Sequence, residues 1–248
     1  MCRHLAYLGP PRSLAELITA PPHSLYEQSW SPRLQDHGTV NADGFGIGWY
    51  PPGPGAAATP VRYRRSIPIW ADINLPDLLP VLHSGAVVAA VRDATAGTSR
   101  DEAASAPFAL GPWLFSHNGS VDEWESLPAD IGEPLTAAEL LSLEARSDAA
   151  LLWLMVARRL RSGHAPADAL ADVVRRTHGV RPDARLNLLL TDGGNLTAVR
   201  LGASLWYHAA ADRVTVASEP VPGRPDWHEV PDHSLLTTHH STVSIKAL

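Results

Sequence analysis

The order in which strand patterns and helix patterns follow one another constrains the fold of this chain more than any other feature. Strand patterns come first. A glycine-spaced pattern at residues 45–50 has its expected partner at 61–65, and short apolar runs bounded by Gly and Pro, which are typical of buried strands, follow at 86–91 and 113–116. Helical patterns follow at residues 148–160 and 166–176. Strand patterns return at residues 186–191, 196–201, 205–208 and 213–217. This order predicts α+β packing and not an alternating parallel sheet.

Chain length and net charge limit the number of domains and the classes of partner to expect. With 248 residues the chain is long enough for one substantial core, and we expect residues 1–248 to form a single domain. Lys and Arg number 20 against 26 Asp and Glu, so the net charge of -6 predicts no nucleic-acid partner and no membrane surface. The net charge is more consistent with a small-molecule or peptide-like substrate than with nucleic acid or a membrane. The sequence leaves open whether copies of the chain associate into a homo-oligomer.

Several classes of protein are not supported by the pattern. A single cysteine, no apolar run of about 20 residues and no secretory signal predict a cytoplasmic protein. His239–His240 lacks a third ligand at a usual spacing, so we expect no metal. Gly44, Gly46 and Gly48 lie in a strand pattern without a following helix, which argues against a nucleotide-binding loop. We therefore expect no cofactor.

Cys2 stands directly behind the initiator methionine. Removal of Met1 would place a thiol and a free α-amine on one residue, and the amine, with an ordinary pKa of about 7.7–8.0, could accept the thiol proton. The alternative is a small, buried apolar residue that happens to lie near the start. Position alone does not decide between these two interpretations.

Three further segments point to the same chemistry. Residues 41–50 read NADGFGIGWY, residues 91–97 read VRDATAG and residues 115–119 read FSHNG. Together with Cys2, and in this order, they resemble the glutaminase domain of class II glutamine amidotransferases, which are N-terminal-nucleophile (Ntn) hydrolases. The resemblance covers the motifs of roughly the first 150 residues. It implies a four-layer αββα sandwich with Cys2 at the end of a central strand between the sheets.

The resemblance also implies the reacting groups. Cys2 is the nucleophile with its own α-amine as base, and the Asn118 side chain with the backbone N–H of Gly119 forms the oxyanion hole. Such donors stabilise the charge that acyl transfer builds on the carbonyl oxygen. Read without the other motifs, Asn118-Gly119 would instead indicate a type I′ hairpin turn.

Substrate-binding residues follow from the same matches. Arg92 is expected to bind the α-carboxylate of the glutamyl group, because a guanidinium matches a carboxylate with two parallel hydrogen bonds. The alternative for Arg92 is an ion pair with Asp93 or Asp101. Asp148 is expected to hold the substrate α-amine, and a helix N-cap is an additional role that this aspartate could fill.

The remaining candidates lie in the matched segments. Thr95 and His117 complete the expected substrate-binding set. Many members of the family have a histidine two residues before the arginine, where this chain has Ala90. This departure weakens an assignment to the ammonia-channelling synthases and leaves the glutamyl chemistry intact.

Within the family, the first nine residues, residues 41–50 and residues 217–220 (ASEP) are similar to the γ-glutamyl hydrolases of ergothioneine biosynthesis. These imply hydrolysis of γ-glutamyl-hercynylcysteine sulfoxide to glutamate and hercynylcysteine sulfoxide. The alternatives are a stand-alone glutaminase or hydrolase of γ-glutamyl peptides such as glutathione, an ammonia-supplying amidotransferase subunit, and an inactive scaffold.

Two structural expectations accompany this substrate. Hercynyl groups carry a permanent trimethylammonium, which aromatic faces bind well. Trp30 and Trp70 lie in loop-like surroundings and are our candidates for that contact. Residues 28–39 are the candidate for a lid over the site.

Overall fold

The computed structural model describes residues 2–51, 59–95, 97–239 and 241–248, and these residues form two antiparallel sheets. Sheet A has the strand order β11-β9-β10-β1-β4-β2-β3. Its strands are β1 (Arg3–Ser13), β2 (Phe45–Trp49), β3 (Val61–Arg65), β4 (His83–Val91), β9 (Trp206–Ala210), β10 (Arg213–Ala217) and β11 (Trp227–Glu229).

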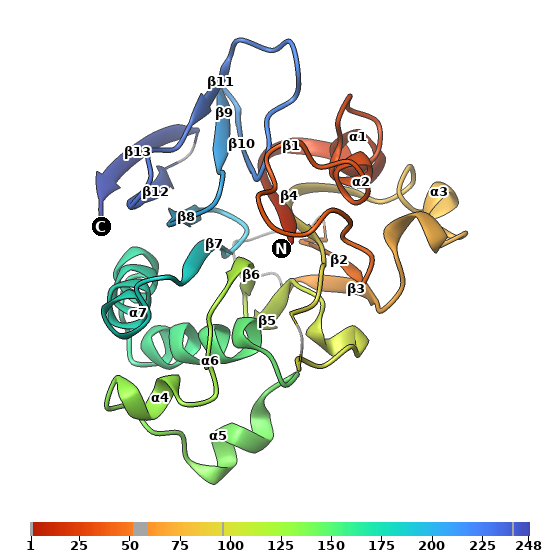
Figure 1. The fold of residues 1–248 in the computed structure, drawn as a ribbon. Helices are drawn as coiled ribbons and strands as arrows, with labels where there is room; N and C mark the ends of the chain where they lie inside the picture. Colours follow the sequence, from red (N-terminus) through yellow and green to blue (C-terminus); the bar gives the residue numbers. More distant parts are fainter. Residues whose placement is uncertain (1, 52–58, 96, 240) are drawn as a thin grey trace.

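Sheet B lies against sheet A and has the order β13-β12-β8-β7-β6-β5. Its strands are β5 (Phe108–Leu110), β6 (Trp113–Ser120), β7 (Arg185–Thr191), β8 (Leu196–Arg200), β12 (Ser234–His239) and β13 (Thr242–Ala247). In Figure 1 the start of β1 lies near the middle of the molecule, close to β6 and β7, whereas the C-terminus lies at the periphery.

Helices cover the outer faces of both sheets. On sheet B lie α6 (Asp148–Arg161) and α7 (Pro166–Val180), and on sheet A lie α1 (Leu14–Ile18), α2 (Leu25–Gln28) and α3 (Leu75–Leu78), on opposite sides of the molecule in Figure 1. The short helices α4 (Leu127–Asp130) and α5 (Ala137–Ser142) and two 3₁₀ turns, Ile69–Ala71 and Glu102–Ala104, lie in the connections. Within the described residues, no helix is long and apolar enough to cross a bilayer.

Three hydrophobic clusters separate these four layers. Successive strand residues point to opposite faces of a sheet. Thus Leu5 and Tyr7 of β1 pack under α1 to α3, whereas Ala6 and Leu8 face sheet B. Likewise, Leu189 of β7 lies between the sheets, while its neighbours on both sides pack against α6 and α7. The predicted α+β fold, a four-layer αββα sandwich, is therefore confirmed.

The structure corrects the expected N-cap of α6 and shows why local patterns did not reveal β1. The N-cap of α6 is Ser147, whose side chain accepts from the N–H of Ala150, so Asp148 is the first helical residue and not the cap. Strand β1 has no clear period-2 pattern because it carries apolar residues on both faces and ends in Pro-Pro-Arg-Ser. Local sequence patterns therefore did not reveal this strand, and only the family resemblance predicted it.

The layer between the sheets gives a stability prediction. Leu114 is fully buried there, and Leu114→Ala should lower the free energy of unfolding by about 2–5 kcal/mol, because the sheets cannot close over the cavity. Leu141 of α5 is 88% exposed, and Leu141→Ala should change it by less than about 0.5 kcal/mol. Urea unfolding of both variants measures the difference. Equal effects would contradict the layer assignment.

Candidate active site

The register of β1 against β4 brings Cys2 to the end of a buried strand. Arg3 pairs with Val91, so Cys2 and Arg92 each lie one residue beyond this pair. On the other side of β4, the N–H of Arg92 donates to the oxygen of Gly44 at 2.8 Å. The Cys2 thiol is half-buried and donates to the carbonyl oxygen of Asp93 at 3.9 Å.

A small pocket at this strand end contains most of the predicted site. Besides Cys2, its lining includes the end of β4, one edge of β6 and the start of α6. The predicted residues among its lining are Cys2, Arg92, Thr95, His117, Gly119 and Asp148. Asn118 lies between two of them in β6 and is fully buried. The structure thus gathers the residues that the family resemblance singled out, and their chemical roles stay predictions.

The environment of Cys2 sets a requirement on the chemistry. Burial raises the pKa of the Cys2 thiol above its ordinary value, because the surrounding protein disfavours the thiolate. The thiol is then protonated at neutral pH, so attack on a carbonyl requires a nearby base. The α-amine of Cys2 would be that base after removal of Met1. Met1 lies outside the described residues.

Arg92 offers a free hydrogen-bond donor in this pocket. Its Nη2 donates to Thr98 Oγ1 at 3.0 Å and to the Ser99 carbonyl oxygen at 2.8 Å. Its Nη1 is buried without a hydrogen-bond partner among the described residues. The alternative partner Asp101 is exposed and bonds to Ser99. A carboxylate in the pocket would satisfy the unpartnered donor, as expected for a substrate clamp.

Asp148 and His117 are held by backbone groups. One carboxylate oxygen of Asp148 accepts from the N–H of Val121 at 3.1 Å and the other from the N–H of Ala149 at 2.8 Å. Each oxygen has a second lone pair for a substrate amine. His117 Nε2 lies 3.0 Å from the carbonyl oxygen of Arg185. Both side chains are therefore fixed before any substrate binds.

The structure places Asn118-Gly119 inside β6 and not in a turn, which excludes the hairpin-turn interpretation. Gly119 pairs with Leu186, whose own N–H donates to Leu201 on the far side. In an antiparallel ladder the N–H of Gly119 then points away from β7. It faces the edge of β6 that β5 leaves open, since β5 pairs only with 113–115.

Only glycine fits at position 119. A Cβ there would overlap the carbonyl oxygen of Arg185 and approach Nε2 of His117 at 2.8 Å. Because the carbonyl belongs to the paired strand, it cannot move aside without disturbing the ladder. The glycine is thus required for the close approach of β6, β7 and the histidine.

The loop after β4 is supported by the segment before β2. The N–H of Asp43 donates to the oxygen of Arg92 at 2.9 Å, and its carboxylate accepts from the N–H of Ala94 at 2.8 Å. Thr95, which is exposed at the rim of the pocket, accepts from Thr98 through its carbonyl oxygen. Residue 96 of the matched segment lies outside the described residues.

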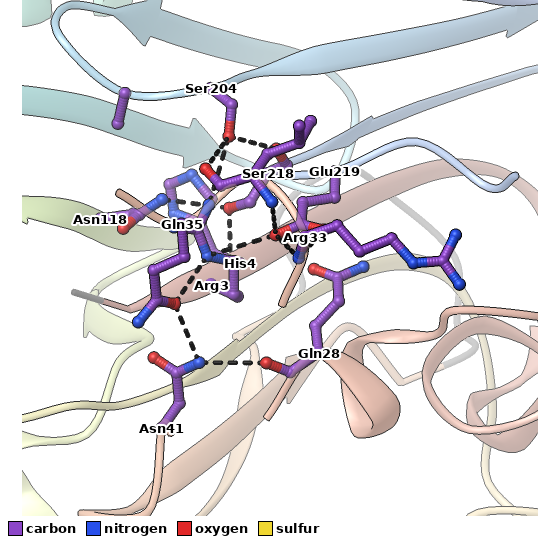
Figure 2. Close-up of polar contacts among 12 residues, drawn as sticks. Arg3, His4, Gln28, Arg33, Gln35, Asn41, Asn118, Ser204, Ser218 and Glu219 are labelled. Atoms are coloured by element: carbon purple, nitrogen blue, oxygen red, sulfur yellow. Dashed lines mark hydrogen bonds and ion pairs between the residues drawn. The ribbon is translucent and has the colours of Figure 1, made fainter. Parts of the chain in front are cut away.

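A buried polar network next to β1 was not predicted from the sequence (Figure 2). The carboxylate of Glu219 accepts from the backbone N–H groups of Arg33 and Leu34 at 2.9–3.1 Å and lies 2.5 Å from His23 Nε2. Arg3, also buried, lies 3.8 Å from it and donates to Gln35 Oε1 at 3.0 Å. The candidate lid at residues 28–39 is therefore anchored in its middle to the strand that carries Cys2.

The aromatic residues form a separate group. Trp30 stacks edge-on against Tyr26 and Trp70, with ring centroids 5.0 and 5.9 Å apart, and both tryptophans are partly exposed. Neither tryptophan is among the described residues that line the Cys2 pocket. Their contact with a substrate cation therefore stays a prediction.

Metal ligands are not gathered in the described part of the chain. No three His, Cys, Asp or Glu side chains among those residues lie close enough together to hold a metal ion. His240, of the sequence pair His239–His240, lies outside the described residues.

With this geometry established, the family can be assigned. Residues 22–212 match the family model of class II glutamine amidotransferases. The chain belongs to this family. The chain is 39% identical to the γ-glutamyl-hercynylcysteine sulfoxide hydrolase of Mycolicibacterium smegmatis, and the alignment covers 100% of both chains. The enzyme of the same name from Mycobacterium tuberculosis (strain CDC 1551 / Oshkosh) is 37% identical over 100% of this chain and 97% of its own.

A solved structure confirms the fold of this chain. A glutamine aminotransferase class-II domain protein from Silicibacter pomeroyi, 24% identical, superposes with a TM-score of 0.69 and covers 99% of each chain. The family match contains Arg92, Asn118, Gly119 and Asp148, whereas Cys2 precedes it. The full-length alignments with the two mycobacterial hydrolases include Cys2 as well.

The Glu219 anchor gives a prediction for the loop. Glu219→Gln removes an acceptor from backbone N–H groups and leaves the charge of Arg3 without its carboxylate, so the free energy of unfolding should fall by about 2–4 kcal/mol. Amide hydrogen exchange of residues 33–35 should accelerate more than that of sheet B.

Glu229→Gln is the matched control, because Glu229 forms an exposed ion pair with Arg200. It should change the free energy of unfolding by less than about 1 kcal/mol. Amide exchange of residues 33–35 could stay as slow in Glu219→Gln as in the unmodified protein. That result would show that the Glu219 carboxylate does not anchor the loop.

Proposed function

We propose that this chain hydrolyses γ-glutamyl-hercynylcysteine sulfoxide to glutamate and hercynylcysteine sulfoxide. The observation that carries the proposal is full-length identity of 37–39% to enzymes of that name. The pocket supports the same chemistry, because a thiol, a guanidinium and a carboxylate surround one small space there. The single cysteine fits a reducing cytoplasm as the place of action.

The proposed reaction begins when Met1 has been removed. The α-amine of Cys2 takes the thiol proton, and the thiolate attacks the carbonyl carbon of the γ-glutamyl amide. Negative charge develops on the carbonyl oxygen, where the Asn118 amide and the Gly119 N–H donate to it. The amine leaves with the proton from the α-amine, and a γ-glutamyl thioester remains on Cys2. Water, deprotonated by the same amine, then releases glutamate and restores the thiol.

The glutamyl group is proposed to bind between two charges. Arg92 Nη1, buried and unpartnered among the described residues, would receive the α-carboxylate. Asp148 would accept from the α-ammonium, since each of its oxygens makes only one backbone hydrogen bond. These contacts recognise the glutamyl part alone. The same pocket would therefore bind the γ-glutamyl end of glutamine or glutathione, and the leaving group must supply the discrimination.

The first experiment compares substrates with purified protein. Glutamate release from γ-glutamyl-hercynylcysteine sulfoxide should exceed release from glutamine and from glutathione in kcat/KM, and Cys2→Ala should abolish it because the nucleophile is lost. Preference for glutathione would assign a γ-glutamyl peptide hydrolase. Preference for glutamine, or activity only with an added synthase partner, would assign an ammonia-supplying subunit. No turnover with Cys2 at the N-terminus would indicate a scaffold.

Arg92→Lys tests the carboxylate clamp. Lysine keeps the charge but not the two parallel donors, so KM should rise by about tenfold or more while kcat stays within about threefold. Arg12→Lys, at an exposed pair with Glu16, is the control and should leave KM unchanged. A fall in kcat at constant KM would show that Arg92 serves the transition state and not the binding of the glutamyl carboxylate.

A further inference from the structure

The buried hydroxyl of Ser218 contacts both His4 of the strand that follows Cys2 and the side chain of Asn118 (Figure 2). Its Oγ accepts from the N–H of His4 at 2.9 Å. It also lies 3.1 Å from the Asn118 amide, which points Nδ2 at it. Ser218 itself is fixed from the other side, because its N–H donates to the His4 oxygen and its carbonyl oxygen accepts from Ser204 Oγ.

With the amide in this orientation, two groups lack partners. The N–H of His4 and Nδ2 of Asn118 both donate to Ser218 Oγ. The hydroxyl proton of Ser218 therefore has no acceptor among these contacts. At the same time Asn118 Oδ1 is buried without a donor among the described residues. Both side chains are fully buried, and an unmade hydrogen bond there is costly.

A half-turn of the Asn118 amide removes this conflict. The amide oxygen and nitrogen have nearly the same shape, so the hydrogen-bond network decides which of them faces Ser218. With the oxygen toward Ser218, the hydroxyl donates to Oδ1 while still accepting from the N–H of His4. The two protons of Nδ2 then become available on the opposite side of the amide.

We propose that Ser218 is a positioning residue, whose hydroxyl orients the Asn118 amide so that its NH₂ group is presented to the developing oxyanion. This inference rests on the proposed function, because it assumes that Asn118 stabilises that charge. A serine suits the task because its oxygen can accept from a backbone N–H while its proton is donated to Oδ1. The strand that carries Cys2 supplies this N–H two residues after the nucleophile, at His4.

A double-mutant cycle on the full chain tests the proposal. Asn118→Ala should lower kcat by about 10²–10³-fold, and Ser218→Ala by about tenfold or more, with KM nearly unchanged in both. In the Asn118→Ala background, Ser218→Ala should have no further effect on kcat beyond about twofold, because the amide that it orients is gone. The rate of Cys2 alkylation by iodoacetamide should be the same in all four proteins.

Ser84→Ala serves as the control for a lost buried hydroxyl, because Ser84 bonds to Tyr50 and Ala86 in sheet A. It should lower Tm without changing kcat per folded molecule. The proposal is overturned if Ser218→Ala leaves kcat unchanged, or lowers it equally in both backgrounds. If Asn118→Ala itself leaves kcat unchanged while Cys2→Ala abolishes turnover, hydrolysis by Cys2 stands, and the oxyanion role of Asn118 fails together with this inference.

Discussion

The pairing of β1 with β4 on one side and with β10 on the other fixes where Cys2 lies relative to Arg92 and Ser218. Through β4 the register sets Cys2 beside Arg92, and through β10 it brings Ser218 to His4. A slip of one residue would exchange the two faces of the strand and move its apolar side chains from one hydrophobic layer to the other. The layers on both sides of sheet A therefore stabilise the register, and the register positions the chemistry.

The site places polar groups where the rest of the fold places apolar ones. Arg3, Glu219 and Asn118 are buried, and burial of such groups is unfavourable unless they are hydrogen-bonded. Most of their atoms find partners within one network, which also holds the loop at residues 33–35. Nη1 of Arg92, a residue that lines the Cys2 pocket, has no hydrogen-bond partner among the described residues. The hydrogen-bonded groups thus hold the network rigid, and we propose that Nη1 of Arg92 is the donor that a substrate carboxylate would use.

Sequence patterns predicted β10, α6 and, as the partner of β2, also β3 almost to the residue. They failed for β1, whose two faces are both buried, and for the network around Glu219, whose partners are backbone N–H groups more than 180 residues away. The site residues were found through their motifs, but periodicity could not show that Asn118 lies within a strand. Long-range pairing, which no local pattern carries, decides that placement.

The central claim is that Cys2 at the chain terminus carries the glutamyl group during the reaction. Rapid acid quenching during turnover of γ-glutamyl-hercynylcysteine sulfoxide, followed by mass spectrometry of the N-terminal peptide, tests it most directly. The account predicts a peptide that begins at Cys2 and is heavier by one γ-glutamyl group. Turnover by protein that retains Met1, or a glutamyl adduct on another residue, would contradict it.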